Sequence, residues 1–167
     1  MGVVGSDIVI RPFEASDLEA CRELFRDGMI GGTIADNDSA LDIDDIQSAY
    51  MESPGNHFWV AANKENKVVG MIGVMQAEEI GEIRRLRVHA DHRRRGIGSA
   101  LLEQALKFCQ DQQFLKVTLD TFIEREAAVK LFEKFQFRLA RTRTVHDKDL
   151  LYFYLDIYTS DGKDTQV

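Results

Sequence analysis

The chain has 167 residues, of which 44% are hydrophobic and 29% charged, and its net charge is −7 at neutral pH. This length suits one domain with a sizeable core, and this composition excludes a disordered chain. No apolar run approaches the ~20 residues that a membrane helix needs, and no secretory signal pattern is seen. Because two cysteines, Cys21 and Cys109, cannot build a disulfide framework, we expect two core thiols in a cytoplasmic protein.

We expect a single domain over residues 1–167, with flexible ends at 1–6 and 160–167. The first of these ends also fits the loose pattern for N-myristoylation of Gly2, and the sequence leaves this modification open.

The hydrophobic pattern predicts eleven elements in the order strand, helix, helix, three strands, helix, strand, helix and two strands. Their predicted bounds are 7–13, 16–28, 41–50, 57–62, 68–76, 82–89, 96–109, 115–119, 126–135, 137–143 and 149–158. Ser16 and Glu19 fit a capping box, so the first helix is expected to begin at Ser16. Residues 28–40 lack periodicity and are predicted to be a loop. This mixture predicts an α+β, or mixed α/β, fold with helices covering a largely antiparallel sheet.

Arginines are concentrated between residues 84 and 95. This arginine-rich segment contains Arg84, Arg85, Arg87, Arg93, Arg94 and Arg95. With Asp91 as its only acid it carries +5, which leaves −12 for the rest of the chain. A nucleic-acid-binding domain is usually basic over a broad face. One basic segment on an acidic protein instead favours a compact polyanionic ligand, with a solvated run of arginines as the alternative.

Two glycines, Gly96 and Gly98, follow this segment at the start of the predicted long helix. Glycine lets the backbone turn tightly and approach a ligand closely. The first turn of a helix also leaves N–H groups without intrahelical partners, which suits a pyrophosphate. No lysine follows Gly98 as in a Walker loop, and Leu101 occupies the third glycine position of a dinucleotide-binding fingerprint. The pattern that fits residues 93–98 is [Gln/Arg]-x-x-Gly-x-[Gly/Ala].

This loop and its flanks resemble the GNAT superfamily, the acyl-CoA-dependent N-acetyltransferases. The similarity includes Leu86-Arg87-Val88 before the loop, Ala100-Leu101-Leu102 after it, and the element order from Ile8 to Tyr158. It implies a central, mostly antiparallel sheet of six to seven strands that splays between its fourth and fifth strands. About four helices would lie on the two faces of this sheet.

The resemblance also implies where acetyl-CoA, the expected co-substrate, would bind. Backbone groups of Leu86, Arg87 and Val88 would pair with pantetheine, and one N–H there would bind the thioester oxygen. The pyrophosphate would be held by Arg93, Arg94, Arg95, Gly96, Ile97, Gly98 and Ser99. A second contact would come from Arg125, Ala128, Leu131 and Phe132. Arg125 and Phe132 stand where the family usually has asparagine and tyrosine.

The catalytic residues are less well defined by this resemblance. Glu82 opens the strand from which the family takes a general base, and it is the candidate for that role. An exposed glutamate paired with a neighbouring arginine is the alternative. Because Phe132 has no hydroxyl, the general acid would be Tyr152, Tyr154 or an ordered water, unless the thiolate leaves without one.

Several other residues have a predicted role. Asp120 and Thr121 are candidate substrate contacts, and the 28–40 loop is expected to shape the acceptor site, with a plain connector as the alternative. Trp59 is expected in the core rather than at a substrate site. The four histidines lack the spacing of metal ligands, so no metal is expected.

The expected function is therefore N-acetyl transfer from acetyl-CoA to a primary amine, by direct attack in a ternary complex. The sequence has no GxSxG elbow and no Cys/His nucleophile pair, which agrees with direct transfer. The acidic net charge favours a cationic small molecule or peptide as acceptor. We expect no nucleic acid or membrane partner, and a monomer or a homodimer. The alternative is a CoA-binding sensor or interaction module without transferase activity, which Arg125 and Phe132 favour.

Overall fold

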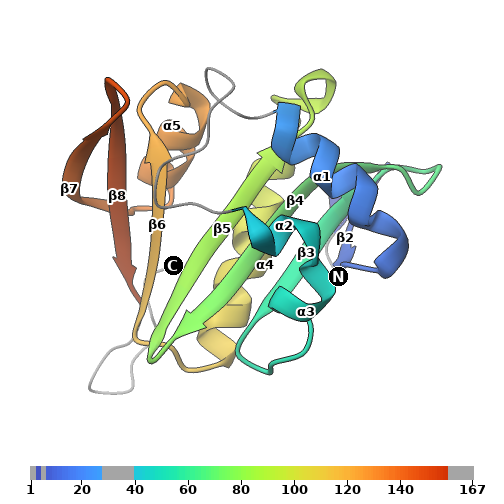
Figure 1. The fold of residues 1–167 in the computed structure, drawn as a ribbon, viewed down its shortest axis with the longest axis horizontal. Helices are drawn as coiled ribbons and strands as arrows, with labels where there is room; N and C mark the ends of the chain where they lie inside the picture. Colours follow the sequence, from blue (N-terminus) through green and yellow to red (C-terminus); the bar gives the residue numbers. More distant parts are fainter. Residues whose placement is uncertain (1–2, 5–6, 28–39, 158–167) are drawn as a thin grey trace. The chain divides into compact units, whose positions relative to one another are not determined.

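The computed structural model describes residues 3–4, 7–27 and 40–157 (Figure 1). Its strands are β1 (Val3–Val4), β2 (Ile8–Pro12), β3 (His57–Ala62), β4 (Val68–Ala77), β5 (Ile80–Val88), β6 (Lys116–Phe122), β7 (Arg138–Val145) and β8 (Lys148–Asp156). Its helices are α1 (Leu18–Asp27), α2 (Leu41–Asp44), α3 (Ile46–Tyr50), α4 (Ile97–Asp111) and α5 (Glu126–Lys134), with 3-10 turns at η1 (Ala15–Asp17) and η3 (Ala90–His92). The described strands form an eight-stranded sheet in the order β1-β2-β3-β4-β5-β6-β8-β7. The predicted mixed α/β fold is confirmed.

The chain divides into two compact units. Unit 1 comprises Met1–Met75 and Ile83–Ala105, and unit 2 comprises Gln76–Glu82 and Leu106–Val167. The first residues of β5 therefore belong to unit 2 and its remainder to unit 1. The expectation of one domain over the whole chain stays a prediction.

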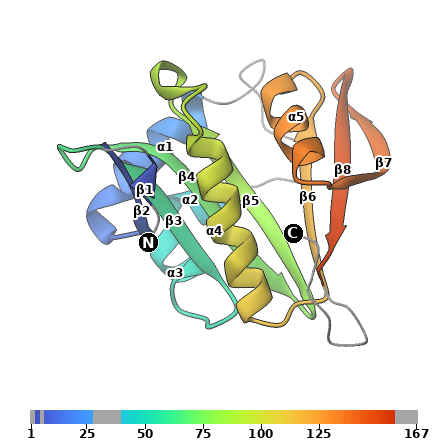
Figure 2. The ribbon, with the colours of Figure 1, turned by 180° about the vertical axis from the view of Figure 1, so that it is seen from behind.

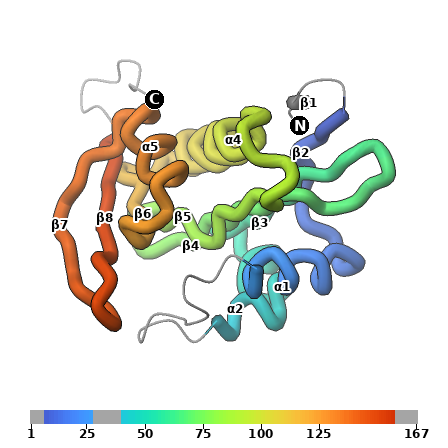
Figure 3. Tube along the Cα trace, turned by 90° about the horizontal axis from the view of Figure 1, so that it is seen from above, coloured from blue at the N-terminus to red at the C-terminus, as the bar shows by residue number. Residues whose placement is uncertain are grey.

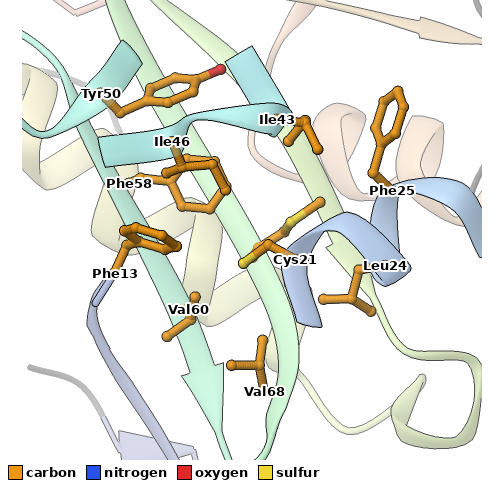
Figure 4. Packing of buried hydrophobic residues seen from close by; sticks show 11 residues of the cluster. Phe13, Cys21, Leu24, Phe25, Ile43, Ile46, Tyr50, Phe58, Val60 and Val68 are labelled. Carbon is orange, nitrogen blue, oxygen red and sulfur yellow. The ribbon is translucent and has the colours of Figure 1, made fainter. Parts of the chain in front are cut away.

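The core of unit 1 lies between its strands and the helices α1 to α3 (Figure 1), while α4 begins on the other face (Figure 3). The buried cluster on the α1 side contains Phe13, Cys21, Leu24, Phe25, Ile43, Ile46, Tyr50, Phe58, Val60, Val68 and Met71 (Figure 4). A Cβ added at Gly73 would lie 2.8 Å from Phe58 and 2.9 Å from Tyr50, so this glycine leaves room for their aromatic contact. Because β3 is covered on both faces, its last five residues are all buried. Trp59 is 3% exposed, which confirms its predicted place in the core.

The first helix is capped differently from the prediction. Asp17, which is buried, accepts two hydrogen bonds from Arg11 at 2.8 and 2.9 Å, and its Oδ2 also accepts the Glu14 N–H at 2.8 Å. The chain from Ala15 therefore forms a 3-10 turn, and α1 begins at Leu18. The predicted cap at Ser16 is wrong because the N-cap is Glu14, whose N–H donates to the Asp17 carboxylate in a capping box.

The predicted helix over 41–50 is also wrong as a single helix. The backbone leaves the helical region at Asp45, where φ is −148° and ψ is 72°. The Asp45 carboxylate accepts the Ser48 N–H at 3.2 Å and so caps α3. An aspartate in this place stabilises a new helix start better than it continues an old helix.

A further difference is β1, where Val3 and Val4 pair with Val9 and Ile8 inside the segment expected to be flexible.

In unit 2, β8 lies between β6 and β7 and pairs antiparallel with both. The helix α5 packs on one face of this sheet, where the Phe132 ring lies 6.1 Å from Phe153 and 5.9 Å from Phe137. The ladder between β5 and β6 is parallel and joins Ile80–Glu82 to Lys116–Thr118. The predicted splay beyond this ladder stays a prediction.

Candidate functional site

The strand β5 contains a residue with unusual backbone geometry at the point where it enters the predicted pantetheine segment. Arg85 has a φ of 59°, in the left-handed region that residues other than glycine rarely adopt. Its guanidinium forms a two-point ion pair with Asp42 of α2, with Nη2 2.6 Å from Oδ1 and Nε 3.0 Å from Oδ2. Both side chains are only 9% exposed. This ion pair thus fixes the side chain of the strained residue.

The ion pair is part of a larger buried cluster. The Tyr50 hydroxyl donates to Asp42 Oδ2 at 2.6 Å, and the Arg85 guanidinium lies 4.9 Å from the centre of the Phe25 ring. Burial alone would raise the pKa of Asp42, but the hydrogen bonds from Arg85 and Tyr50 outweigh it and lower that pKa. Burial and the charge of Asp42 raise the pKa of Tyr50 far above its ordinary value. Asp42 is therefore ionised and Tyr50 neutral near neutral pH.

Arg87 has a similar structural contact. Its guanidinium lies 5.9 Å from the Phe25 ring, and its Nη1 donates to the Leu86 carbonyl at 2.9 Å. Two of the six arginines in the arginine-rich segment therefore pack against α1 from β5. Their side chains support the strand rather than extend toward solvent.

The loop after β5 is held at its start by His89. The His89 N–H donates to the Val69 carbonyl at 2.8 Å, and its Nδ1 accepts the Asp91 N–H at 3.1 Å. The chain then becomes exposed at Arg93, Arg94, Arg95 and Gly96. Arg94 and Gly96 both have positive φ, 65° and 79°. These values turn the chain sharply into α4 and leave three guanidinium groups at its start.

The helix α4 follows the loop after β5 (Figure 2), and its first turn has the donors that a phosphate group needs. The Ala100 N–H donates to the Gly96 carbonyl at 3.0 Å, so the N–H groups of Ile97, Gly98 and Ser99 have no partner inside the helix. Ile97 itself is 1% exposed and anchors the turn. The positive end of the helix dipole adds to these donors and to the nearby arginines. The residues present therefore fit the pyrophosphate of coenzyme A.

The second predicted cofactor segment is on α5 in unit 2. Arg125 is the N-cap of α5, and its carbonyl accepts the Val129 N–H at 3.0 Å. Ala128 and Leu131 are half-buried, whereas Phe132 is 3% exposed within the aromatic core of unit 2. Phe132 thus supplies an apolar ring in place of a hydroxyl. Cofactor contact by these four residues stays a prediction.

Strand pairing brings the catalytic candidates to one face of unit 2. Glu82 pairs with Thr118, and Thr118 pairs with Tyr154. In the next row toward the end of β6, Asp120 pairs with Tyr152. Directly paired residues project from the same face of a sheet, and positions two apart share that face. Glu82, Asp120 and both tyrosines therefore lie on the face opposite the one that α5 covers.

Thr121 is separated from this group by strand alternation. It pairs with Leu151, is 7% exposed, and so projects to the opposite face from Asp120. Of the two expected substrate contacts, only Asp120 lies with Glu82 and the tyrosines.

Burial explains the state of the two cysteines. Cys21 and Cys109 are free and buried, which confirms their predicted place in the core. Burial raises the pKa of each thiol to about 12, so both stay protonated.

Residues 3–4, 7–27 and 40–157 contain no group of three His, Cys, Asp or Glu side chains that could hold a metal ion. None of their helices is long and apolar enough to cross a membrane. The predicted acceptor loop, apart from Ala40, and Gly2 lie outside the described residues.

The loop and its flanks lie inside a match to a known family. The model of the acetyltransferase (GNAT) family matches residues 18–137. The chain belongs to the GNAT acetyltransferase family. The match includes β5, the Arg93–Gly96 loop, α4 and α5 of this GNAT protein, so it confirms the resemblance that the sequence motif indicated.

Two curated relatives share part of this GNAT chain. N-acetyltransferase 8 of Homo sapiens is 37% identical over 103 residues, which cover 58% of this chain and 45% of the relative. N-acetylaspartate synthetase of Xenopus tropicalis is 37% identical over 99 residues, which cover 58% of this chain and 36% of the relative. The chain thus spans less than half the length of either relative.

A solved structure has the same fold. The acetyltransferase yncA of Salmonella typhimurium, solved with its cofactor acetyl-CoA, aligns with a TM-score of 0.76 over 94% of this chain and 98% of its own. The two sequences are 17% identical, so this likeness shows the GNAT fold alone.

The buried ion pair between Asp42 and Arg85 is the feature that sequence reasoning missed. The two residues are 43 positions apart, and no motif links them. Charge alone placed Arg85 with the ligand-binding arginines. The one available signal was the presence of aspartates, Asp42 among them, on the apolar side of a predicted amphipathic helix.

Proposed function

We propose that this chain is an acetyl-CoA-dependent N-acetyltransferase that acetylates a primary amine in a ternary complex. The observation that carries this proposal is the start of α4, where the N–H groups of Ile97, Gly98 and Ser99 lack intrahelical partners beside the exposed Arg93 to Arg95. Membership of the GNAT family gives this anion site its ligand, the pyrophosphate of coenzyme A.

Bound acetyl-CoA supplies the acetyl group as a thioester. In the proposed reaction the amine nitrogen bonds to the acetyl carbon and the carbon–sulfur bond breaks. CoA leaves as a thiol, with the proton that the amine loses. Backbone groups of Leu86, Arg87 and Val88 would pair with pantetheine, and one N–H there would donate to the thioester oxygen, where such a donor stabilises the charge that develops.

Unit 2 provides the candidates for proton transfer. Glu82 would accept a proton from the acceptor ammonium, so that the amine can attack. Tyr152 and Tyr154 share the face of Glu82, and either hydroxyl could donate to the departing sulfur. The buried Phe132 cannot do so, because its ring has no exchangeable proton.

Other properties of the protein are part of the same proposal. We place it in the cytoplasm, where acetyl-CoA and reduced thiols are both available. The net charge of −7 favours a cationic acceptor. The relative named N-acetylaspartate synthetase suggests the contrasting case, an acceptor with carboxylates beside its amine. Both kinds of acceptor belong in a functional screen.

The test is a screen of amines with acetyl-CoA that follows thiol release, together with calorimetric binding of CoA. We expect CoA binding and turnover of at least one amine. In Glu82→Gln, we expect kcat to fall by about 10²- to 10⁴-fold, the range for loss of a general base, with an unchanged KM for acetyl-CoA. Wild-type rates in this variant across the pH range would remove Glu82 from the mechanism.

A second candidate function, a CoA-binding module without transfer activity, is favoured by the absence of a hydroxyl at the buried Phe132. It predicts CoA binding without thiol release from any amine in the screen. Absence of CoA binding would contradict both functions.

A further inference from the structure

The face of unit 2 opposite α5 carries polar and aromatic side chains in rows across four strands. The first row runs from Glu82 through Thr118 and Tyr154 to Arg138, which pairs with Tyr154. The second row runs from Asp120 through Tyr152 to Arg141. We name these seven residues the polar face of unit 2. The seven residues form one continuous surface, because the strand register places each of them beside the next on the same face of the sheet.

A bulge in β7 explains why both arginines belong to this face. Leu139 pairs with Phe153 and Arg141 pairs with Tyr152, so Ala140 is an extra residue in β7. Without it, strand alternation would place Arg138 and Arg141 on opposite faces, since they are three positions apart. The bulge therefore adds a second guanidinium to the polar face.

Charge is segregated along these rows. Within these two rows the carboxylates, Glu82 and Asp120, are on β5 and β6 and the guanidinium groups are on β7. The adjoining row of the same face holds the ion pair between Lys116 of β6 and Asp156 of β8. Neighbouring strands lie ~4.8 Å apart, so the β6 and β7 backbones lie roughly 10 Å from each other, with β8 between them. A ligand lying across β8 would meet carboxylates at one end and guanidinium groups at the other. This is the charge pattern of an amino acid, with an amine at one end and a carboxylate at the other.

Tyr152 of β8 positions one of the two guanidinium groups. The Arg141 guanidinium lies 4.0 Å from the centre of the Tyr152 ring, over the middle of the face rather than out at the sheet edge. Among the described residues, no carboxylate lies within ion-pair distance of Arg138 or Arg141. In contrast with Arg85, these two groups keep their charge and their donors for a ligand.

A half-open surface pocket of about 480 Å³ adjoins this arrangement. It is lined by Gln136, Arg138, Tyr154, Leu155 and Asp156. Cavities of this size hold small organic ligands. Arg138 and Tyr154 therefore belong both to the polar face and to a space in which a ligand can fit.

We propose that the polar face of unit 2 binds the acceptor, and that this acceptor is an amino acid whose carboxylate is held by Arg138 and Arg141. The inference rests on the proposed acetyltransferase function and names the substrate class of the same site. A guanidinium favours a carboxylate because it donates two parallel hydrogen bonds to it, whereas a cationic acceptor group there would meet like charge. The amine end of the acceptor then lies toward Glu82 and Asp120.

The test compares amino acids with their own α-carboxamides as acceptors, which differ only in the carboxylate. We expect kcat/KM for the best amino acid to exceed that of its amide at least about tenfold. In Arg141→Gln, KM for the amino acid should rise about 10- to 100-fold, the range for loss of a charged hydrogen bond. Turnover of the amide and KM for acetyl-CoA should both stay unchanged. Arg138→Gln should act in the same direction.

The control is Lys134→Gln, which removes the same charge from the exposed end of α5 and should leave the amino acid preference intact. Equal or better turnover of the amides, or an amino acid preference that survives Arg138→Gln with Arg141→Gln, would overturn the inference while leaving the acetyltransferase function in place.

A binding measurement keeps the two proposals distinguishable if no amine is turned over. The same amino acids and amides are titrated calorimetrically into the protein saturated with CoA. Binding of an amino acid that Arg141→Gln abolishes supports the polar face as its site, even where transfer fails. Absence of amino acid binding in the wild-type protein overturns the inference.

Discussion

Arg85 and the Arg93–Arg95 group come from one run of arginines, yet the fold uses them in opposite ways. Arg85 is 9% exposed and pairs with Asp42 at 2.6 Å from a left-handed backbone position. Arg93, Arg94 and Arg95 are exposed at the start of α4. A cluster of positive charge in the sequence therefore contains structural cations, Arg85 and Arg87, as well as three exposed guanidinium groups beside α4. Of these three, Arg93 also donates its Nε–H to the Val88 carbonyl at 3.4 Å. Local charge predicts that an anion binds, but only packing decides which arginines bind it.

The largest effect should come from removing the buried arginine, Arg85. Arg85→Ala leaves the Asp42 carboxylate buried without its cation, and loss of one partner of a buried pair costs about 3–5 kcal/mol. In a chain of this length we expect the melting temperature to fall by roughly 6–20 °C. Arg94→Ala removes the same charge from an exposed position and should change the unfolding free energy by less than about 0.5 kcal/mol. Similar melting temperatures for the two variants would refute the distinction.

The second effect concerns the turn between the exposed arginines and α4. Gly96 has a φ of 79°, which a β-branched residue adopts only at a cost of about 1–3 kcal/mol. Gly96→Val should therefore distort the turn and weaken CoA binding at least about tenfold by calorimetry. Gly96→Asn is the matched variant, because asparagine tolerates the left-handed region. It should retain most of the affinity, and equal losses in both variants would point to side-chain bulk instead of backbone geometry.

Single changes within the exposed group should have smaller effects. Arg93→Gln, Arg94→Gln and Arg95→Gln each remove one charge near the proposed pyrophosphate, and we expect CoA affinity to fall about 3- to 30-fold for each. Loss of one charged hydrogen bond at a solvated site lies in this range or below it. Added salt should weaken CoA binding less in each variant than in the wild type. Arg26→Gln on α1, also an exposed arginine, should leave CoA affinity unchanged, and an equal loss there would indicate a general charge effect.

Much of the fold follows from local patterns in the sequence. Two apolar runs on either side of the polar turn at 63–67 predicted β3 and β4, and the apolar spacing of Ile97, Leu101 and Cys109 predicted α4. The loop could be placed because the glycines, the arginines and the helix start are adjacent in sequence. These features depend on residues close together along the chain, so periodicity and motif spacing capture them.

The features that the sequence did not reveal depend on distant partners or on competing caps. Asp42 and Arg85 form an ion pair although they are 43 positions apart in the sequence. Asp17 accepts hydrogen bonds from Arg11, and the first helix is therefore not capped at Ser16 as its local sequence predicts. The bulge at Ala140 has no glycine or other marker in β7, so nothing indicated that Arg138 and Arg141 share a face. Register and long-range pairing are set by the folded sheet as a whole.

The smallest predicted effect is a pH dependence of the unfolding free energy that comes from the buried ion pair of Asp42 and Arg85. Folding lowers the pKa of Asp42 below its ordinary value of 3.8, because Arg85 and Tyr50 hydrogen-bond its charged form. The unfolded chain then binds this proton more tightly, so the stability from Asp42 is fully present above pH 3.8 and is lost as the pH falls through the folded pKa. Denaturant unfolding at a series of pH values should show the stability advantage of the wild type over Asp42→Asn shrinking in acid. In an Arg85→Ala background the lowered pKa loses its main cause, and the same comparison should show no such acid-dependent loss. A difference that persists in that background would assign the pH dependence to another group.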